Sequence, residues 1–138
     1  MKTLEIHPVG YVIARMANGE DILASLNRAA QDRGIRNGLI LSGVGSVASY
    51  HVHVVETTNL PPGNLYWKED NPFDVVSITG LIMDGRVHAH IALSDRERTV
   101  AGHLEPGCRV LTFCIATIAV LDDADPIADL DRYESSAG

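Results

Sequence analysis

The sequence has few of the residues that mark specialised protein classes. It contains only two cysteines, Cys108 and Cys114, which are too few for a disulfide scaffold and too far apart for Cys-x-x-Cys chemistry. Both lie in an apolar segment, so we expect buried, reduced thiols. No apolar run approaches the length of a membrane span. Lys2 and Glu5 precede any apolar stretch, so no signal peptide is visible. These absences predict a cytoplasmic protein without a membrane partner.

Positive charge is also scarce. The chain has 11 lysines and arginines against 18 aspartates and glutamates, which gives a formal net charge of −7. Nucleic-acid-binding domains usually present a basic face, and the basic residues here are dispersed along the chain. The charge balance therefore disfavours DNA as a partner. The exception would be an oligomer in which Arg96 and Arg98 from several chains form a basic ring.

Length and periodicity indicate one domain with a predominantly β architecture. At 138 residues the chain is long enough to bury a core. Apolar residues at helical spacing from Ile22 to Ala30 predict one main helix, with Asn18 as a candidate cap and Gly34 as its end. We expect an α+β fold, in which a mainly antiparallel sheet of about seven strands curls toward a barrel. The predicted strands cover residues 9–16, 39–41, 47–55, 74–83, 86–94, 99–104 and 109–121.

Two segments are expected to lie outside this sheet. Residues 57–72 are rich in proline and include the only tryptophan, Trp67, so we predict a long loop. The domain is expected to span residues 1–121, followed by an acidic segment, 122–138, that we interpret as a mobile C-terminal tail. The Trp67 loop and the apolar strands need a covering surface, which favours self-association.

Three histidines in one short stretch carry the strongest functional signal. His88 and His90 are two residues apart in an apolar, β-branched run, so on a strand both imidazoles lie on one face. A hairpin centred between Arg96 and Glu97 places His103 opposite His90, with their Cβ atoms about 5 Å apart. Three imidazoles with an open fourth position are typical of catalytic zinc. The alternatives are a polar strand surface, or a longer loop with a shifted register, because Arg-Glu is not a favoured two-residue turn.

Other polar residues are candidates for the same site. If the strand continues past His103, Glu105 shares the face of the histidines, where a carboxylate could act as a general base. A surface turn residue is the favoured interpretation of Glu105. His51 and His53 form a second His-x-His pair. They either line the same cleft or, as we expect, face solvent.

A glycine pattern raises the question of nucleotide binding. Gly43-Val-Gly45-Ser-Val-Ala48 follows a predicted strand and matches the dinucleotide fingerprint G-x-G-x-x-A. That fingerprint requires a helix next, because the pyrophosphate binds at a helix N-terminus. The residues that follow are strand-like, so we expect a bulge or tight turn and no nucleotide site.

Four motifs occur in a specific order. They are residues 39–47 (LILSGVGSV), residues 73–80 (FDVVSITG), His88-Ala-His90 and Gly102-His103-Leu104-x-x-Gly107. Over residues 9–121 this set resembles the PPC (plants and prokaryotes conserved) domain. Arg15 and the helix start at residues 19–22 also fit the resemblance.

The resemblance implies a compact α+β domain that assembles as a homotrimer. Prokaryotic PPC domains of this kind hold zinc with three histidines, so it implies Zn²⁺ at His88, His90 and His103. Acetolactate decarboxylase is more distantly similar and also holds zinc with three histidines. This similarity suggests a metal-dependent lyase or hydrolase, with an unknown small molecule at the open metal position. Plant members join the domain to AT-hooks, and many prokaryotic members are described as DNA-binding, which makes a DNA-associated regulator the alternative.

The sequence departs from the family pattern in three places. It has no Arg-Gly-Arg-Pro AT-hook, Ala101 stands where a second glycine is common, and residues 112–115 (TFCI) lack a glutamate that members often carry. The first departure weakens the case for DNA binding, and the last removes one acid–base candidate. We therefore expect a zinc-binding, homotrimeric domain that acts as an enzyme or small-molecule binder.

Overall fold

The structure is a computed structural model that describes residues 1–131. Within these residues it contains seven strands, one α-helix and one short 3-10 helix, which confirms the predicted α+β fold. In chain order the elements are β1 (Pro8–Ala17), α1 (Ile22–Asp32), β2 (Gly38–Val55), β3 (Asn64–Glu69), β4 (Phe73–Met83), β5 (Arg86–Ser94), β6 (Thr99–Leu104), β7 (Arg109–Leu121) and η1 (Ile127–Asp131).

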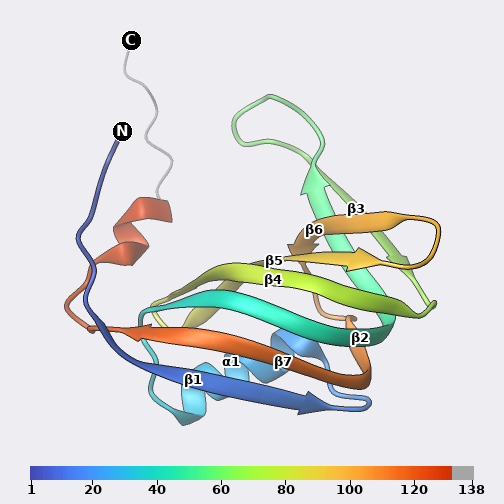
Figure 1. Cartoon of the computed structure of the whole chain (residues 1–138). Coiled ribbons are helices and arrows are strands. Elements are labelled where there is room, and N and C mark those ends of the chain that lie inside the picture. The colour runs from blue at the N-terminus through green and yellow to red at the C-terminus, as the bar shows by residue number, and fades with distance from the viewer. Residues whose placement is uncertain (132–138) are drawn as a thin grey trace.

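The seven strands form one antiparallel sheet that closes on itself. The strand order is β1-β7-β2-β4-β5-β6, β3 pairs with β2, and β6 returns to pair with the far end of β2. Strands β2, β4, β5 and β6 therefore make a closed ring, with α1 beneath the sheet (Figure 1). This closure is the curling that the sequence predicts, and it brings β2 beside β6.

The long strand β2 closes the ring because it bends. Its pairing with β7 shifts register between Ile40 and Ser42 and again on both sides of Val47, and such bulges bend a strand. A Cβ at Gly43 would lie 2.5 Å from Ile78, so only glycine allows β4 to approach there. The Gly-x-Gly pattern is thus a bulged, continuous strand without a following helix, which confirms that it is not a dinucleotide fingerprint.

Helix α1 begins one turn later than its candidate cap suggested. The cap is Asp21, whose carboxylate accepts a hydrogen bond from the backbone N–H of Ala24 (2.9 Å). The prediction of Asn18 was wrong, because its amide instead donates to the carbonyl of Leu111 (2.5 Å). The other carboxylate oxygen of Asp21 accepts from the N–H of Gly107 (2.6 Å). One aspartate therefore fixes both the helix start and the turn after β6.

The segment 57–72 is not one loop. It contains β3, which pairs with β2 from Tyr50 to Val55. Trp67 packs against the hydrophobic core, whereas its neighbours Leu65 and Tyr66 are exposed. Trp67 therefore needs no covering partner.

The described part of the acidic tail packs against the domain. Ile127 in η1 is buried, and the amide of Asn37 donates to the carbonyl of Asp125 (2.7 Å). The Asp125 carboxylate accepts from the backbone N–H of His7 (2.7 Å) and lies 3.0 Å from its Nδ1. Residues 122–131 therefore differ from the expected mobile tail, and 132–138 lie outside the described residues. Neither α1 nor η1 has the length and apolar character needed to cross a membrane.

Candidate metal centre

The β5–β6 hairpin has the register that the sequence predicts. Ser94 pairs with Thr99, and His90 lies directly opposite His103. The turn is closed by Asp95, whose carboxylate accepts hydrogen bonds from the backbone N–H groups of Glu97 (2.7 Å) and Arg98 (2.8 Å). This side chain supplies the turn geometry that an Asn-Gly pair would otherwise provide.

His88, His90 and His103 converge on the outer face of the sheet. One nitrogen from each lies within 4.8 Å of the others. The ring centroid of His103 is 4.7 Å from that of His88 and 5.6 Å from that of His90. Nitrogens that each lie about 2.0–2.1 Å from a tetrahedral zinc are about 3.3 Å apart, so small side-chain rotations would bring these three to ligand distance. The donor set therefore fits zinc.

The protonation of these histidines favours metal binding. Burial lowers the pKa of His90, and the nearby His88 and His53 lower it further. Burial is also the main cause of the lowered pKa of His103, followed by His53 and His88. Neutral imidazole is the form that binds metal, and a lowered pKa keeps both rings neutral near pH 7.

His53 joins this cluster, so the expectation that it faces solvent was wrong. The end of β2 pairs with β6 and places His53 opposite His103, with their ring centroids 4.4 Å apart. The His53 Nδ1 lies 2.6 Å from Oε1 of Glu105, and both side chains are largely buried. Glu105 is therefore more than a surface turn residue, although β6 ends at Leu104.

His51 lies at the rim of this arrangement. Its Nδ1 is 2.8 Å from the carbonyl oxygen of Pro106, and it belongs to neither of the potential metal-binding groups in the described residues. Behind it, Cys108 and Cys114 are free and buried, as predicted. Burial raises the pKa of each thiol to about 11, so neither is a reactive thiolate.

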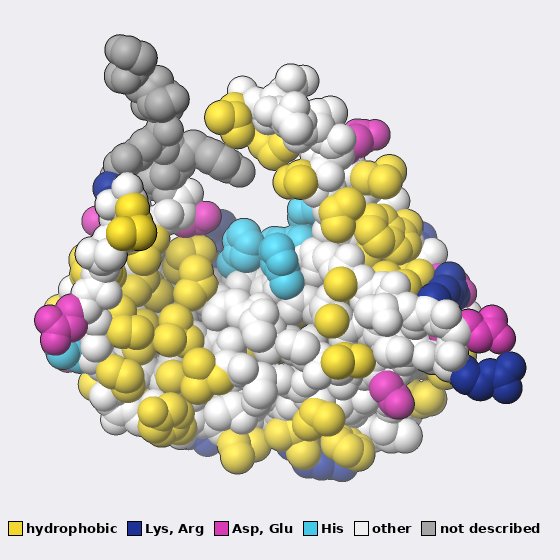
Figure 2. Space-filling model, turned by 45° about the horizontal axis from the view of Figure 1, so that its top comes forward, with side chains coloured by type: hydrophobic (Ala, Val, Ile, Leu, Met, Phe, Trp, Pro, Cys, Tyr) yellow, Lys and Arg dark blue, Asp and Glu magenta, His cyan; other side chains and the backbone are white. Residues whose placement is uncertain are grey.

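An exposed apolar surface adjoins the histidines. Tyr11 pairs with Ala119, Ala119 with Leu39, Leu39 with Leu81, and Leu81 with His88. Directly paired residues share a face, so this row links the outer face of β1 to the histidines. Figure 2 shows hydrophobic side chains beside the histidines on this side of the molecule. Exposed side chains on this outer apolar face include Tyr11, Ile13, Val44, Leu111 and Phe113.

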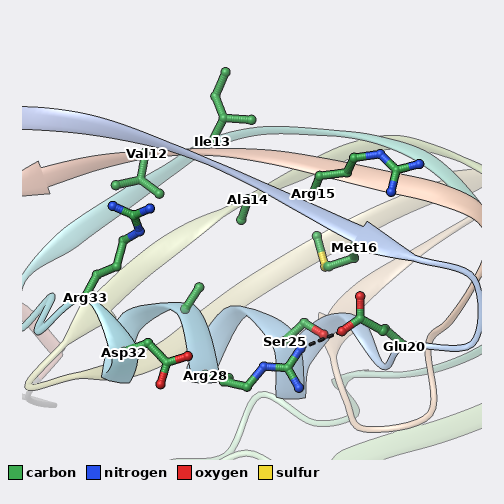
Figure 3. A pocket seen from close by; sticks show the side chains of 11 residues that line it. Val12, Ile13, Ala14, Arg15, Met16, Glu20, Ser25, Arg28, Asp32 and Arg33 are labelled. Atoms are coloured by element: carbon green, nitrogen blue, oxygen red, sulfur yellow. Dashed lines mark hydrogen bonds and ion pairs between the residues drawn. The ribbon is translucent and has the colours of Figure 1, made fainter.

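A separate cleft of about 640 Å³ lies between β1 and α1 (Figure 3). Its lining includes Val12 and Met16, which point from β1 toward the helix. The Arg28 guanidinium donates to Glu20 (2.5 Å), and Glu20 also accepts from the N–H of Ala17 (2.7 Å). These polar groups thus stabilise the connection between β1 and α1, and the cleft adds no chemistry to the candidate centre.

Comparison with known proteins agrees with this architecture. Residues 8–122 match the sequence profile of the Plants and Prokaryotes Conserved (PCC) domain, also abbreviated PPC. The chain belongs to the PCC domain family. Two curated relatives, each the bifunctional protein GlmU of a Synechococcus strain, are 27% and 29% identical over 111 residues. Those residues are 80% of this chain but only 16% of either relative.

Solved structures share the PCC fold. A metal-containing protein of Archaeoglobus fulgidus is 20% identical with a TM-score of 0.78, covering 88% of this chain and 86% of its own. A PPC protein of Pyrococcus horikoshii is 20% identical with a TM-score of 0.75, covering 91% and 87%. A protein of Ralstonia eutropha, named as a candidate DNA-binding protein, is 22% identical with a TM-score of 0.67, covering 85% and 81%. At these identities the likeness shows the fold.

Proposed function

We propose that this PCC domain binds zinc through His88, His90 and His103. The observation that carries the proposal is the pairing of His90 with His103, with His88 on the same face and all three donor nitrogens within 4.8 Å. All three are imidazoles, which suit Zn²⁺. The structural neighbour described as metal-containing adds support from a protein of the same fold.

The fourth metal position would be open to a small molecule. Among the described residues, the group that holds His88, His90 and His103 includes no fourth ligand, and His53 belongs to the other potential metal-binding group. Zinc with three protein ligands supplies Lewis acidity, and the reaction class that we propose is a metal-dependent lyase or hydrolase. In it Glu105 and His53 would hold a proton between Oε1 and Nδ1, which are 2.6 Å apart.

We also propose that the domain assembles as a homotrimer. The outer apolar face leaves Tyr11 and Ile13 each 70% exposed, and a surface of this kind usually marks an interaction site. The family resemblance supplies the number three. A trimer that packs through this face would also enclose the approach to His88, since the paired row from Leu39 through Leu81 to His88 joins this face to the histidine.

DNA binding is the second candidate, favoured by the names of structural neighbours such as the Ralstonia eutropha protein. The charges of this chain oppose it. The Arg98 guanidinium donates to Glu69 (2.6 Å) and lies 3.5 Å from Asp95, while Arg96 lies 3.4 Å from Glu97. The two arginines that could form a basic ring therefore lie beside carboxylates, whose negative charge opposes the binding of phosphate.

Metal analysis of protein purified without a histidine tag tests the zinc proposal. We expect about one zinc per chain in the wild type and loss of zinc in His90→Ala, because two imidazoles rarely hold zinc tightly. His51→Ala is the matched control, since His51 lies outside the ligand set, and it should keep its zinc. Full retention of metal by His90→Ala would refute the ligand assignment.

A further inference from the structure

A second potential ligand set lies directly beside the first. It consists of His53, His103 and Glu105, which each offer one donor atom within 4.8 Å of the others. His53 comes from the end of β2, His103 from β6, and Glu105 is the residue after β6. The two sets overlap at His103 alone.

We infer that His53, His103 and Glu105 form a second divalent-cation site, which competes with the first set for His103. This second site goes beyond the proposed zinc function. Only the competition for His103 depends on zinc binding at the first set. The second set binds a cation of its own even if the first set binds none.

The competition follows from the chemistry of imidazole. A neutral imidazole has one nitrogen with a free lone pair, because the other nitrogen carries the proton. His103 can therefore bind only one ion at a time while its other nitrogen carries the proton. The ring centroid of His103 is 4.4 Å from that of His53 and 4.7 Å from that of His88, so His103 is within reach of either set.

The second set is held in place without a metal. The 2.6 Å hydrogen bond joins His53 to Glu105, whose side chains are 16% and 20% exposed. The ring of His53 also packs against Tyr66 at 4.8 Å, and the N–H of Glu105 donates to the carbonyl of His51 (3.1 Å). A cation that binds here replaces the hydrogen bond between the donors and releases its proton to solvent.

The two sets differ in the metal that they favour. The first set offers three neutral nitrogens, which suit zinc, whereas the second offers two nitrogens and an anionic carboxylate. Two histidines and one carboxylate with open positions are typical of Fe²⁺ sites, and carboxylate donors also suit Mn²⁺. The same donor set also holds zinc in some enzymes, so zinc competes for this site too. We therefore assign the second site to a divalent cation of the Mn²⁺ or Fe²⁺ type.

Mn²⁺ binding by a variant without the first set provides the test. His88→Ala/His90→Ala protein, stripped of metal and with the wild-type far-UV circular dichroism, is titrated with Mn²⁺ while electron paramagnetic resonance measures the free ion. We expect about one Mn²⁺ per chain. Adding Glu105→Gln should weaken binding tenfold or more, since it removes the anionic donor at nearly unchanged shape. No Mn²⁺ binding to the double variant, or unchanged binding after Glu105→Gln, would overturn the second site.

A competition experiment keeps the test independent of the alanine variants. In the wild type, Mn²⁺ affinity should fall tenfold or more on Glu105→Gln, while zinc affinity should stay within about threefold. One equivalent of zinc should displace bound Mn²⁺. Simultaneous binding of zinc and Mn²⁺ by one chain would refute the sharing of His103. The zinc proposal fails separately, if wild-type protein binds no zinc, or if His90→Ala still keeps zinc once Glu105→Gln has also disabled the second set.

Discussion

Gly102→Ala should loosen the contact between β2 and β6 that brings His53 to His103. A Cβ at Gly102 would lie 2.7 Å from the carbonyl oxygen of His53 and 3.2 Å from the Cβ of Val52, whereas ordinary contacts begin at 3.4 Å. The strands would have to separate by the difference, about 0.7 Å. Overpacking of this kind costs about 1–3 kcal/mol of unfolding free energy. In a chain of this length that corresponds to a Tm lower by roughly 3–15 °C.

Gly10→Ala is the control for this substitution. Gly10 is also a strand glycine, and no atom lies within 4 Å of its would-be Cβ, so its unfolding free energy should change by less than about 0.5 kcal/mol. Thermal and urea unfolding of both variants provide the comparison. Zinc stoichiometry should survive Gly102→Ala, because His88, His90 and His103 all lie on the β5–β6 hairpin. Equal Tm values for the two variants would refute the close approach of β6 to β2.

Three further predictions concern assembly, DNA and pH. Ile13→Asp should lower the sedimentation mass from trimer to monomer by charging the outer apolar face, whereas Val55→Asp, which is exposed at the end of β2, should leave a trimer. Gel-shift titration at physiological salt should show no sub-micromolar binding to duplex DNA; sequence-dependent binding would restore the regulatory alternative. Asp125 raises the pKa of His7 above 6.5, so their ion pair should stabilise the docked tail fully below about pH 6.5 and less as the pH rises through the raised pKa. His7 also lowers the pKa of Asp125, so at acid pH this stabilisation should fade only below pH 3.8. An NMR titration should give His7 a pKa above 6.5, and Asp125→Asn should return that pKa toward 6.5.

Local patterns predicted most of the sheet. The hairpin register follows from sequence because strand alternation fixes which residues share a face, and a short charged turn leaves little freedom of register. The bounds of β5, β6 and β7 match those predicted from their apolar runs. The metal candidates His88, His90 and His103 could be placed together because they lie on adjacent strands of one hairpin.

The long-range part of the site could not be predicted in this way. His53 reaches His103 only because bulges bend β2 far enough to pair with β6, and the number and placement of bulges are not readable from alternation. The His51-x-His53 spacing was the available signal, since it places both rings on one strand face. The cap was missed for a related reason: Asn18 and Asp21 are both suitable residues, and only the position of Gly107 shows why Asp21 is used.

X-ray absorption at the zinc edge of untagged, zinc-loaded protein identifies the atoms that bind the metal. We expect three imidazole nitrogens at about 2.0–2.1 Å and one exchangeable oxygen ligand from solvent. His90→Ala should remove this spectrum, and His51→Ala should leave it unchanged. Four imidazoles around the zinc would contradict the open fourth position, and a wild-type protein that binds no zinc would refute the zinc site altogether.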